Sequence, residues 1–116
     1  MKRETLEKKI QREIEAALGA EPDLLLLRNS VGMAKHTSDD GKTWHVPYGL
    51  GTGSPDLVGI LAPSGRWVCL EVKAAEGDVD PAQLKCHAIW RKFGAFVAVV
   101  RSVEEARAAL DEARAS

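Results

Sequence analysis

The stretch from residue 53 to residue 73, GSPDLVGILAPSGRWVCLEVK, decides the fold of this chain. Two apolar runs flank a Pro-Ser-Gly turn, and this pattern predicts two strands, residues 56–62 and 66–73, joined as a hairpin. The first run begins with an acid, and the second ends with an acid and a lysine that interrupt its apolar pattern. Charges in such a run are unfavourable unless they are paired or bound to a metal. The stretch therefore predicts a polar site at one end of the hairpin.

The register of this hairpin brings three charged residues together. A turn centred near Ser64 places Asp56 opposite residues 71–73. Side chains alternate along a strand, so Glu71 and Lys73 share one face, roughly 6–7 Å apart, while the residue between them points into the core. Two carboxylates with no soft ligand nearby favour a hard cation such as Mg²⁺ or Mn²⁺. A surface hairpin with a cross-strand Asp–Lys pair is the alternative that spacing alone leaves open.

The backbone carbonyl of Val72 is a further candidate ligand, because it lies along the sheet near the same place. The glycines at residues 49–53 do not form a phosphate loop, since no Lys-Ser/Thr pair follows them and no helix begins there. We interpret these glycines as residues that give the backbone conformational freedom beside Asp56.

The flanking segments predict a sheet covered by helices. Apolar spacing and cap residues predict helices at residues 4–18, 80–93 and 102–114. Asp80 and Ser102 are the expected N-caps, with Glu105 completing a capping box in the last helix. Two further apolar segments predict buried strands at residues 24–29 and 95–100. We expect one α/β domain spanning residues 1–116, in the order αβββαβα, with a mixed central sheet flanked by helices.

The long polar connection between residues 30 and 54 contains Asp-Asp-Gly-Lys at 39–42, which predicts a small hairpin. A connection of this length is usually functional. The tryptophans of the chain are predicted to lie in the core or at an interface rather than to stack on bases: Trp44, Trp67 and Trp90. We exclude zinc at His36 and His45, because no Cys or other His stands at ligand spacing.

Composition restricts the class of protein. The chain has 116 residues with a net charge of −1, which argues against a protein that simply coats nucleic acid. Residues 1–12 nevertheless carry a net charge of +3, and residues 102–116 a net charge of −2. A charged N-terminus and the lack of a long apolar run predict no signal peptide, no membrane span and a cytoplasmic location. Cys69 and Cys86 are expected to be reduced thiols.

At Pro55-Asp56 and Glu71-Val72-Lys73 the chain resembles the PD-(D/E)XK nuclease superfamily. Its size and element order resemble the stand-alone VRR-NUC proteins of phages and bacteria within that superfamily. A glycine-led approach to Asp56 and a glutamine, Gln83, in the helix after the motif strand support this narrower resemblance. The resemblance implies a restriction-endonuclease-like fold and a DNA endonuclease that requires Mg²⁺ or Mn²⁺, in a bacterium or a phage-infected cell.

The resemblance also implies roles for individual residues. Asp56 and Glu71 would bind the metal, and Lys73 would be the catalytic lysine. Gln83 would orient water or the lysine, although an ordinary polar role in the first turn of its helix is the alternative. Glu7 would reach the metal from the first helix, since it lies one turn from Gln11 on the same face. Other glutamates of that helix are alternatives: Glu4, Glu13 and Glu15.

The resemblance further implies a structure-selective substrate such as branched DNA, for example a Holliday junction in DNA repair. A symmetric homodimer with two sites suits such a substrate. The candidates for the dimer interface are the 33–48 hairpin and the region near Trp90. Polar residues in or beside the long connection are interpreted as contacts to the DNA backbone, with an ordinary solvated loop as the alternative: Arg28, Asn29, Lys35 and Lys42.

Three rival functions are left open by the sequence. The first is a DNA-binding or accessory module that keeps the fold without catalysis, and the intact Asp56, Glu71 and Lys73 argue against it. The second is a structural dimerisation domain of a phage or mobile element, which predicts no stabilisation by metal. The third is a sequence-specific nuclease, which ranks lower because no base-reading element is evident beyond the loop.

Overall fold

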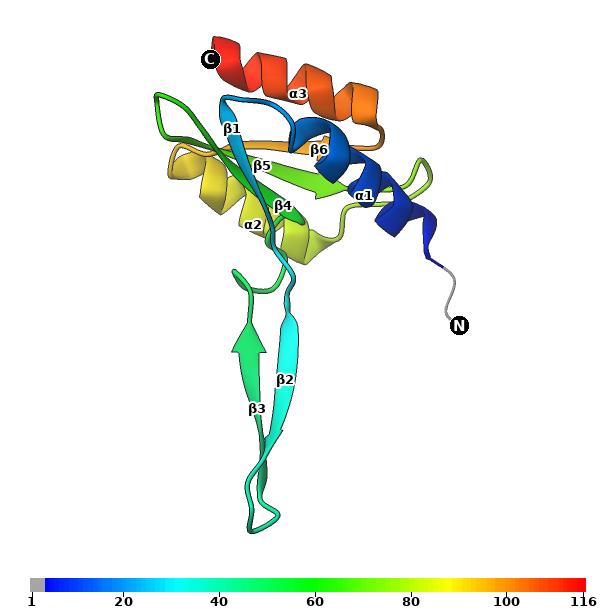
Figure 1. Ribbon diagram of the computed structural model, residues 1–116, viewed down its shortest axis with the longest axis vertical. Coiled ribbons are helices and arrows are strands. Elements are labelled where there is room, and N and C mark those ends of the chain that lie inside the picture. Colours follow the sequence, from blue (N-terminus) through cyan, green and yellow to red (C-terminus); the bar gives the residue numbers. More distant parts are fainter. Residues whose placement is uncertain (1–3) are drawn as a thin grey trace.

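A mixed four-stranded sheet of order β1-β4-β5-β6 forms the centre of the computed structural model, which describes residues 4–116 (Figure 1). β4 is antiparallel to β1 and β5, and β6 is parallel to β5. This arrangement confirms the expected α/β class. Lys2 and Arg3 of the basic N-terminal segment lie outside the described residues. The elements in chain order are α1 (Leu6–Leu18), β1 (Leu24–Arg28), β2 (Gly32–Thr37), β3 (Thr43–Tyr48), β4 (Leu57–Leu61), β5 (Arg66–Val72), α2 (Pro81–Lys92), β6 (Phe96–Val100) and α3 (Val103–Ala115).

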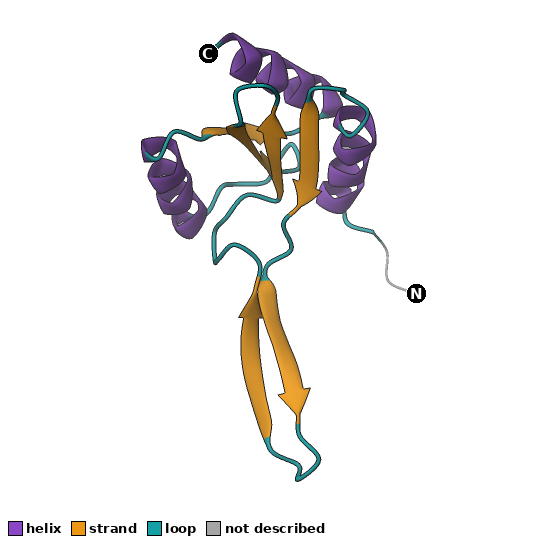
Figure 2. Cartoon of the chain, turned by 60° about the vertical axis from the view of Figure 1, so that its left-hand side comes forward, coloured by secondary structure: helices purple, strands orange, loops and turns teal. Residues whose placement is uncertain are grey.

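Helices cover both faces of the sheet. α1 and α3 lie on one face, where Val68, Leu70 and Val72 of β5 are fully buried among their apolar side chains. α2 lies on the other face, against Val58 and Cys69 (Figure 2). Because alternate residues of β5 enter two different cores, its register is strongly fixed. The ladder of β4 and β5 begins at Leu57 opposite Leu70, so Asp56 just before it lies near the end of β5, where its carboxylate accepts from the N–H of Val72.

β1 differs from its prediction as a buried strand. It forms an edge of the sheet, and only Leu24 is buried, while Leu25 and Leu27 remain 58% and 52% exposed. An edge strand covered by helices on one face buries only alternate side chains, so four consecutive leucines cannot all enter the core. The β6 prediction holds better, because Val97 and Val100 are buried in the two cores on opposite faces of the sheet.

The helix caps explain where α2 and α3 begin. The Asp80 carboxylate accepts from the backbone N–H of Gln83 (2.9 Å), and the Gln83 side chain accepts from the N–H of Asp80 (3.0 Å). Ser102 caps α3 by accepting from the N–H of Glu105 (3.1 Å). The predicted capping box of α3 is wrong in its second half, because the Glu105 carboxylate accepts from Arg101 rather than from Ser102.

β2 and β3 pair into the predicted hairpin, which forms a separate sheet and projects as an arm from the body of the molecule (Figures 1 and 2). We call residues 32–48 the arm. Trp44 on the arm is 47% exposed and Trp67 on β5 is 44% exposed, so a core position is wrong for both. Cys69 is buried and Cys86 partly buried, and both are free thiols. In residues 4–116 the helices are too short or too polar to cross a bilayer.

Candidate functional site

Asp56 and Glu71 meet where β4 begins and β5 ends. The Asp56 carboxylate accepts a hydrogen bond from the backbone N–H of Val72 through Oδ2 (2.8 Å), which ties it across the hairpin. Pro55 and Ser54 before it are buried, so the backbone that presents Asp56 is held firmly. Asp56 itself is partly exposed, whereas Glu71 is 1% exposed. The structure therefore brings the two predicted carboxylates together.

Electrostatics at Glu71 disfavours its negative charge. The pKa of Glu71 is raised to about 9, chiefly by burial and next by the adjacent Asp56 carboxyl. Lys73 lowers the pKa of Glu71, and Glu7 from α1 raises it. A divalent cation would relieve this crowding of carboxylates by lowering the free energy of the ionised form.

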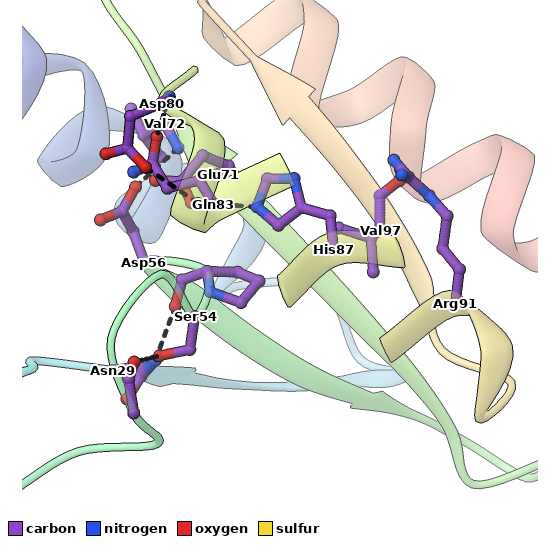
Figure 3. A network of polar contacts seen from close by, with 12 residues as sticks. Asn29, Ser54, Asp56, Glu71, Val72, Asp80, Gln83, His87, Arg91 and Val97 are labelled. Atoms are coloured by element: carbon purple, nitrogen blue, oxygen red, sulfur yellow. Dashed lines mark hydrogen bonds and ion pairs between the residues drawn. The ribbon is translucent and has the colours of Figure 1, made fainter. Parts of the chain in front are cut away.

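His87 is a member of the site that the sequence analysis missed. Its Nε2 lies 3.2 Å from Oε1 of Glu71, and both side chains are 1% exposed (Figure 3). Burial, followed by the nearby charges of Arg91 and Lys73, lowers the pKa of His87 and keeps the imidazole neutral. A signal was present in the sequence, because His87 follows Gln83 by four residues and therefore lies on the same face of α2.

Lys73 lies just beyond β5 and is 9% exposed. Its backbone N–H donates to the carbonyl of Val100 (3.1 Å), which extends the pairing with β6 by one step. The loop after it is fastened by Arg101, whose guanidinium donates to the carbonyls of Ala74 (2.6 Å) and Gly77 (2.7 Å). Among residues 4–116 no carboxylate lies within 4.0 Å of the Lys73 ammonium as an ion pair. Its charge is thus held near Glu71 without being neutralised.

A polar cavity of about 440 Å³ opens beside Asp56. α1 contributes Lys8 and Gln11, and Gln11 is 5% exposed although it is polar. Gln83 and Tyr48 also line the cavity, from α2 and the base of the arm. Glu71 and Lys73 are buried and are not among the lining residues. The cavity combines one cation, three amides and the carboxylates of Asp56 and Asp80, which suits a polar ligand, and a cation bound between the carboxylates would make it suit an anionic one.

The donor set fits magnesium or manganese better than a metal that needs a complete protein cage. Within residues 4–116 no three His, Cys, Asp or Glu side chains converge as a metal cluster. The candidate donors are Asp56, Glu71 and the carbonyl of Val72. Mg²⁺ is commonly held by one or two carboxylates and keeps several waters. Glu7 is partly buried and influences the charge of Glu71, but it does not complete a trio, so its role as a ligand stays a prediction.

The predicted DNA-contacting residues fall into two places. Asn29 supports the site itself: its Nδ2 donates to Ser54 Oγ (2.8 Å) and to the carbonyl of Pro55 (2.7 Å), and its Oδ1 accepts from the N–H of Leu50 (3.1 Å). Arg28 pairs with Glu15 (3.0 Å) and stays largely exposed. The remaining two residues lie away from the cavity on the exposed arm: Lys35 and Lys42.

The glycine-rich approach to Asp56 has the backbone freedom expected of it. Gly49, Gly51 and Gly53 all have positive φ, from 85° to 103°. At Gly53 an added Cβ would lie 2.6 Å from the carbonyl oxygen of Ala82 in the first turn of α2. The loop therefore packs directly on the helix that carries Gln83 and His87.

A mixed sheet with helices on both faces, and with clustered carboxylates and a lysine where two strands meet, defines a nuclease-like fold. The VRR-NUC domain model matches residues 42–104. The chain belongs to the VRR-NUC domain family. A solved structure described as a VRR_NUC domain is similar with a TM-score of 0.62 and 28% identity, over 93% of this chain and 97% of that chain. A comparison with curated proteins finds no match.

Proposed function

We propose that this protein is a divalent-metal-dependent DNA endonuclease that hydrolyses phosphodiester bonds. The observation that carries the proposal is the meeting of Asp56 with the buried Glu71, where carboxylate charge is unfavourable without a cation. Membership of a nuclease-related family supports the class of reaction. The buried, unneutralised Lys73 beside Glu71 supports catalysis rather than a merely structural ion pair.

Each residue then has a distinct role. Asp56 and Glu71 would hold Mg²⁺ or Mn²⁺, with the carbonyl of Val72 as a third ligand. Such an ion, when bound, polarises a phosphoryl oxygen and lowers the pKa of water. Lys73 would position the attacking water or stabilise negative charge that develops on the phosphate. The oxygen of Gln83 is engaged in the capping box, so only its Nε2–H group is left to orient water or substrate.

The cavity beside Asp56 is the proposed place of the scissile phosphate. Lys8 supplies a cation to it, and Gln11 and Gln83 supply amide donors. We further propose that DNA extends from the cavity onto exposed basic residues, which would contact phosphates without reading bases. The proposed contacts outside the cavity are Arg28, Lys35 and Lys42. Asn29, whose amide hydrogens are donated to Ser54 and Pro55, would instead hold the loop at the cavity edge.

We propose branched DNA, such as a Holliday junction, as the substrate and a homodimer as the acting form. The arm supports the dimer. Side chains alternate along its strands, so Trp44, Val46 and Tyr48 share one face with Ala34 and His36 of the neighbouring strand. We call this face the arm stripe. It carries no Asp, Glu, Lys or Arg, and the large apolar side chains of β3 in it are 40–49% exposed. A second copy of the same uncharged stripe is the occupant that fits it, as an isologous contact.

The test is cleavage of fluorescent four-way junction, flap, duplex and single-stranded DNA with Mg²⁺ or Mn²⁺. Asp56→Asn keeps an oxygen that can accept from Val72 but removes the charge, and we expect it to lower the cleavage rate by at least about 10³-fold. Asp78→Asn is the matched control, because it makes the same change at an exposed position of the loop between β5 and α2. It should cut like the wild type.

The main rival, a non-catalytic accessory module, predicts a different result. It would bind junction DNA with the wild-type chain but produce no metal-dependent cleavage on any of the four substrates. Equal cleavage by the wild type and Asp56→Asn would also end the catalytic assignment, since it would show that the activity does not depend on the site. Preference for the junction over the duplex separates a structure-selective enzyme from a general one.

A further inference from the structure

We infer that His87 is a positioning residue for metal binding: its imidazole fixes one carboxylate oxygen of Glu71, so that the other oxygen is presented to the cation. This inference rests on the proposed function, since it concerns the same carboxylates. It assigns a role to a residue on α2 that lies outside the acidic and lysine motif. His87 would act through Glu71 and would not touch the metal or the DNA.

The contact is specific in its geometry. Nε2 of His87 faces Oε1 of Glu71 at 3.2 Å, and neither side chain is accessible to water that could replace the partner. Within residues 4–116 the Glu71 carboxyl has two side-chain partners, the His87 imidazole at Oε1 and the adjacent Asp56 carboxyl. A carboxylate can turn about the bond that joins it to the side chain, so a hydrogen-bond donor is needed to hold it in one orientation. The imidazole is therefore the group that sets which oxygen of Glu71 turns toward Asp56.

The chemistry of the pair matches this role. An ionised Glu71 accepts hydrogen bonds only, so in the metal-bound form Nε2 must carry the proton and donate it. Carboxylates that bind metals are commonly held by such outer donors, and removal of the donor typically weakens metal binding 10–100-fold. α2 supports the imidazole rigidly, because Gly53 packs on its first turn and the capping box of Asp80 and Gln83 fixes its start.

A purely structural role makes a different prediction. If the pair only stabilises the core, loss of the donor lowers the melting temperature but leaves the metal affinity of the folded chain unchanged. The two roles are separated by the position of the donor atom. Gln at residue 87 carries an N–H donor at the position of Nε2, whereas Asn carries its donor nearer the backbone, at the position of Nδ1. Leu carries none and has a similar bulk.

The experiment measures Mn²⁺ binding to the full chain by electron paramagnetic resonance of the free ion, at a temperature where circular dichroism shows all variants folded. The variants are His87→Gln, His87→Asn and His87→Leu, with Asp56→Asn as the variant that removes the charge of a proposed ligand. We expect the dissociation constant for Mn²⁺ to rise about 10–100-fold in His87→Asn and His87→Leu, and to stay within about threefold of wild type in His87→Gln. Metal-free melting curves of the same variants record the structural effect separately.

Unchanged Mn²⁺ affinity in His87→Leu would overturn the inference and leave the proposed function intact. Equal weakening in His87→Gln and His87→Leu would also overturn it, because the shape of the ring rather than its donor would then matter. If the wild type and Asp56→Asn bind Mn²⁺ equally, the proposed metal site itself is wrong, and the inference falls with it. Weaker Mn²⁺ binding in His87→Asn and His87→Leu, together with near-wild-type affinity in His87→Gln, supports the positioning role.

Discussion

At the scale of single residues, the negative charge of Glu71 is strongly disfavoured in the folded protein. Glu71 is almost fully buried next to Asp56, and within residues 4–116 its close basic neighbours are a neutral imidazole and the largely buried Lys73. A buried carboxyl with a raised pKa binds its proton more tightly in the folded state than in the unfolded state. The folded chain without metal therefore favours protonated Glu71, and a bound cation would replace that proton.

This property predicts how stability depends on pH in the metal-free protein. The pKa of Glu71 rises from an ordinary 4.5 to about 9 on folding. Between these values the folded state binds more protons than the unfolded state, so the free energy of unfolding falls as pH rises. We expect a slope approaching about −1.4 kcal/mol per pH unit in denaturant titrations from pH 6.5 to 8.5 with chelator present. Below pH 6.5 His87 makes the free energy of unfolding rise with pH, because its lowered pKa leaves fewer protons bound in the folded state than in the unfolded state.

The control for this prediction is Glu71→Gln, which keeps the size of the side chain and cannot ionise. Its stability should be nearly flat over the same range and should exceed that of the wild type at pH 8.5. Saturating Mn²⁺ should flatten the wild-type curve as well, because the ion then holds Glu71 ionised. A wild-type slope that Glu71→Gln leaves unchanged would assign the pH dependence to other groups.

The residues of the site were predictable to different degrees. Asp56, Glu71 and Lys73 could be placed together because a short turn fixes hairpin register and a strand alternates its faces. His87 had only the weaker signal of its four-residue spacing from Gln83, because a helix position is known to point into a site only when the crossing of helix and sheet is known. The engagement of Gln83 in a cap was equally hidden, since a polar residue in a first helical turn fits a cap and a catalytic site alike.

At the scale of elements, the glycine-rich loop and the first turn of α2 form one unit that presents Asp56. Gly53 has a φ of +85°, and a Cβ there would meet the Ala82 carbonyl oxygen at 2.6 Å. Gly51 has a φ of +103°, but nothing lies within 4 Å of an added Cβ. These two glycines therefore share the cost of positive φ and differ only in close packing.

Gly53→Ala and Gly51→Ala form a matched pair on this basis. An alanine in the left-handed region costs about 1 kcal/mol at either position. Gly53→Ala must also push the loop away from α2, so we expect it to lose at least about 1 kcal/mol more stability than Gly51→Ala and to bind Mn²⁺ more weakly. Urea denaturation and the Mn²⁺ titration measure the two effects. Equal losses in both variants would contradict the view that the contact with α2 positions Asp56.

The limits of sequence prediction at this scale are clearest at β1. Its four leucines predicted a buried strand, but position at the edge of a sheet is decided by the order in which distant strands pair, which local apolarity does not record. The hairpin at residues 32–48 was predictable from its turn residues, whereas its projection from the body was not. The direction of an arm depends on the short segments that join it to β1 and to the glycine-rich loop.

At the scale of the whole molecule, the arm is the part that the fold alone does not explain. A two-stranded hairpin is only marginally stable by itself in water. The arm has local support from the stacked rings of His36 and Trp44, whose centroids lie 5.6 Å apart, and from Tyr48 lying over Gly32. These contacts still leave the arm stripe exposed. A second copy would cover it and would hold two nuclease sites in one assembly.

The dimer proposal predicts that a charge on the arm stripe separates the subunits. Trp44→Glu places a carboxylate at the end of the stripe nearest the hairpin turn, and large aromatic residues commonly dominate such interfaces. We expect sedimentation equilibrium to give twice the chain mass of 12.6 kDa for the wild type, and a dimer dissociation constant raised at least tenfold, by about 1.4 kcal/mol or more, in Trp44→Glu. Thr43→Glu, on the opposite face of the same strand, should remain dimeric.

The contrast between neighbouring positions makes the dimer prediction specific to one face. Trp44→Phe keeps an apolar ring and should retain the dimer, so a loss confined to Trp44→Glu cannot be attributed to a missing indole alone. Dissociation in both Thr43→Glu and Trp44→Glu would indicate that the arm has unfolded, and a monomeric wild type would remove the dimer from the proposal. If Trp44→Glu is monomeric yet cuts duplex DNA like the wild type while losing its preference for four-way junctions, the dimer serves substrate selection. The phosphodiester chemistry then belongs to each chain separately, as expected if Asp56, Glu71 and Lys73 of one chain form a complete site.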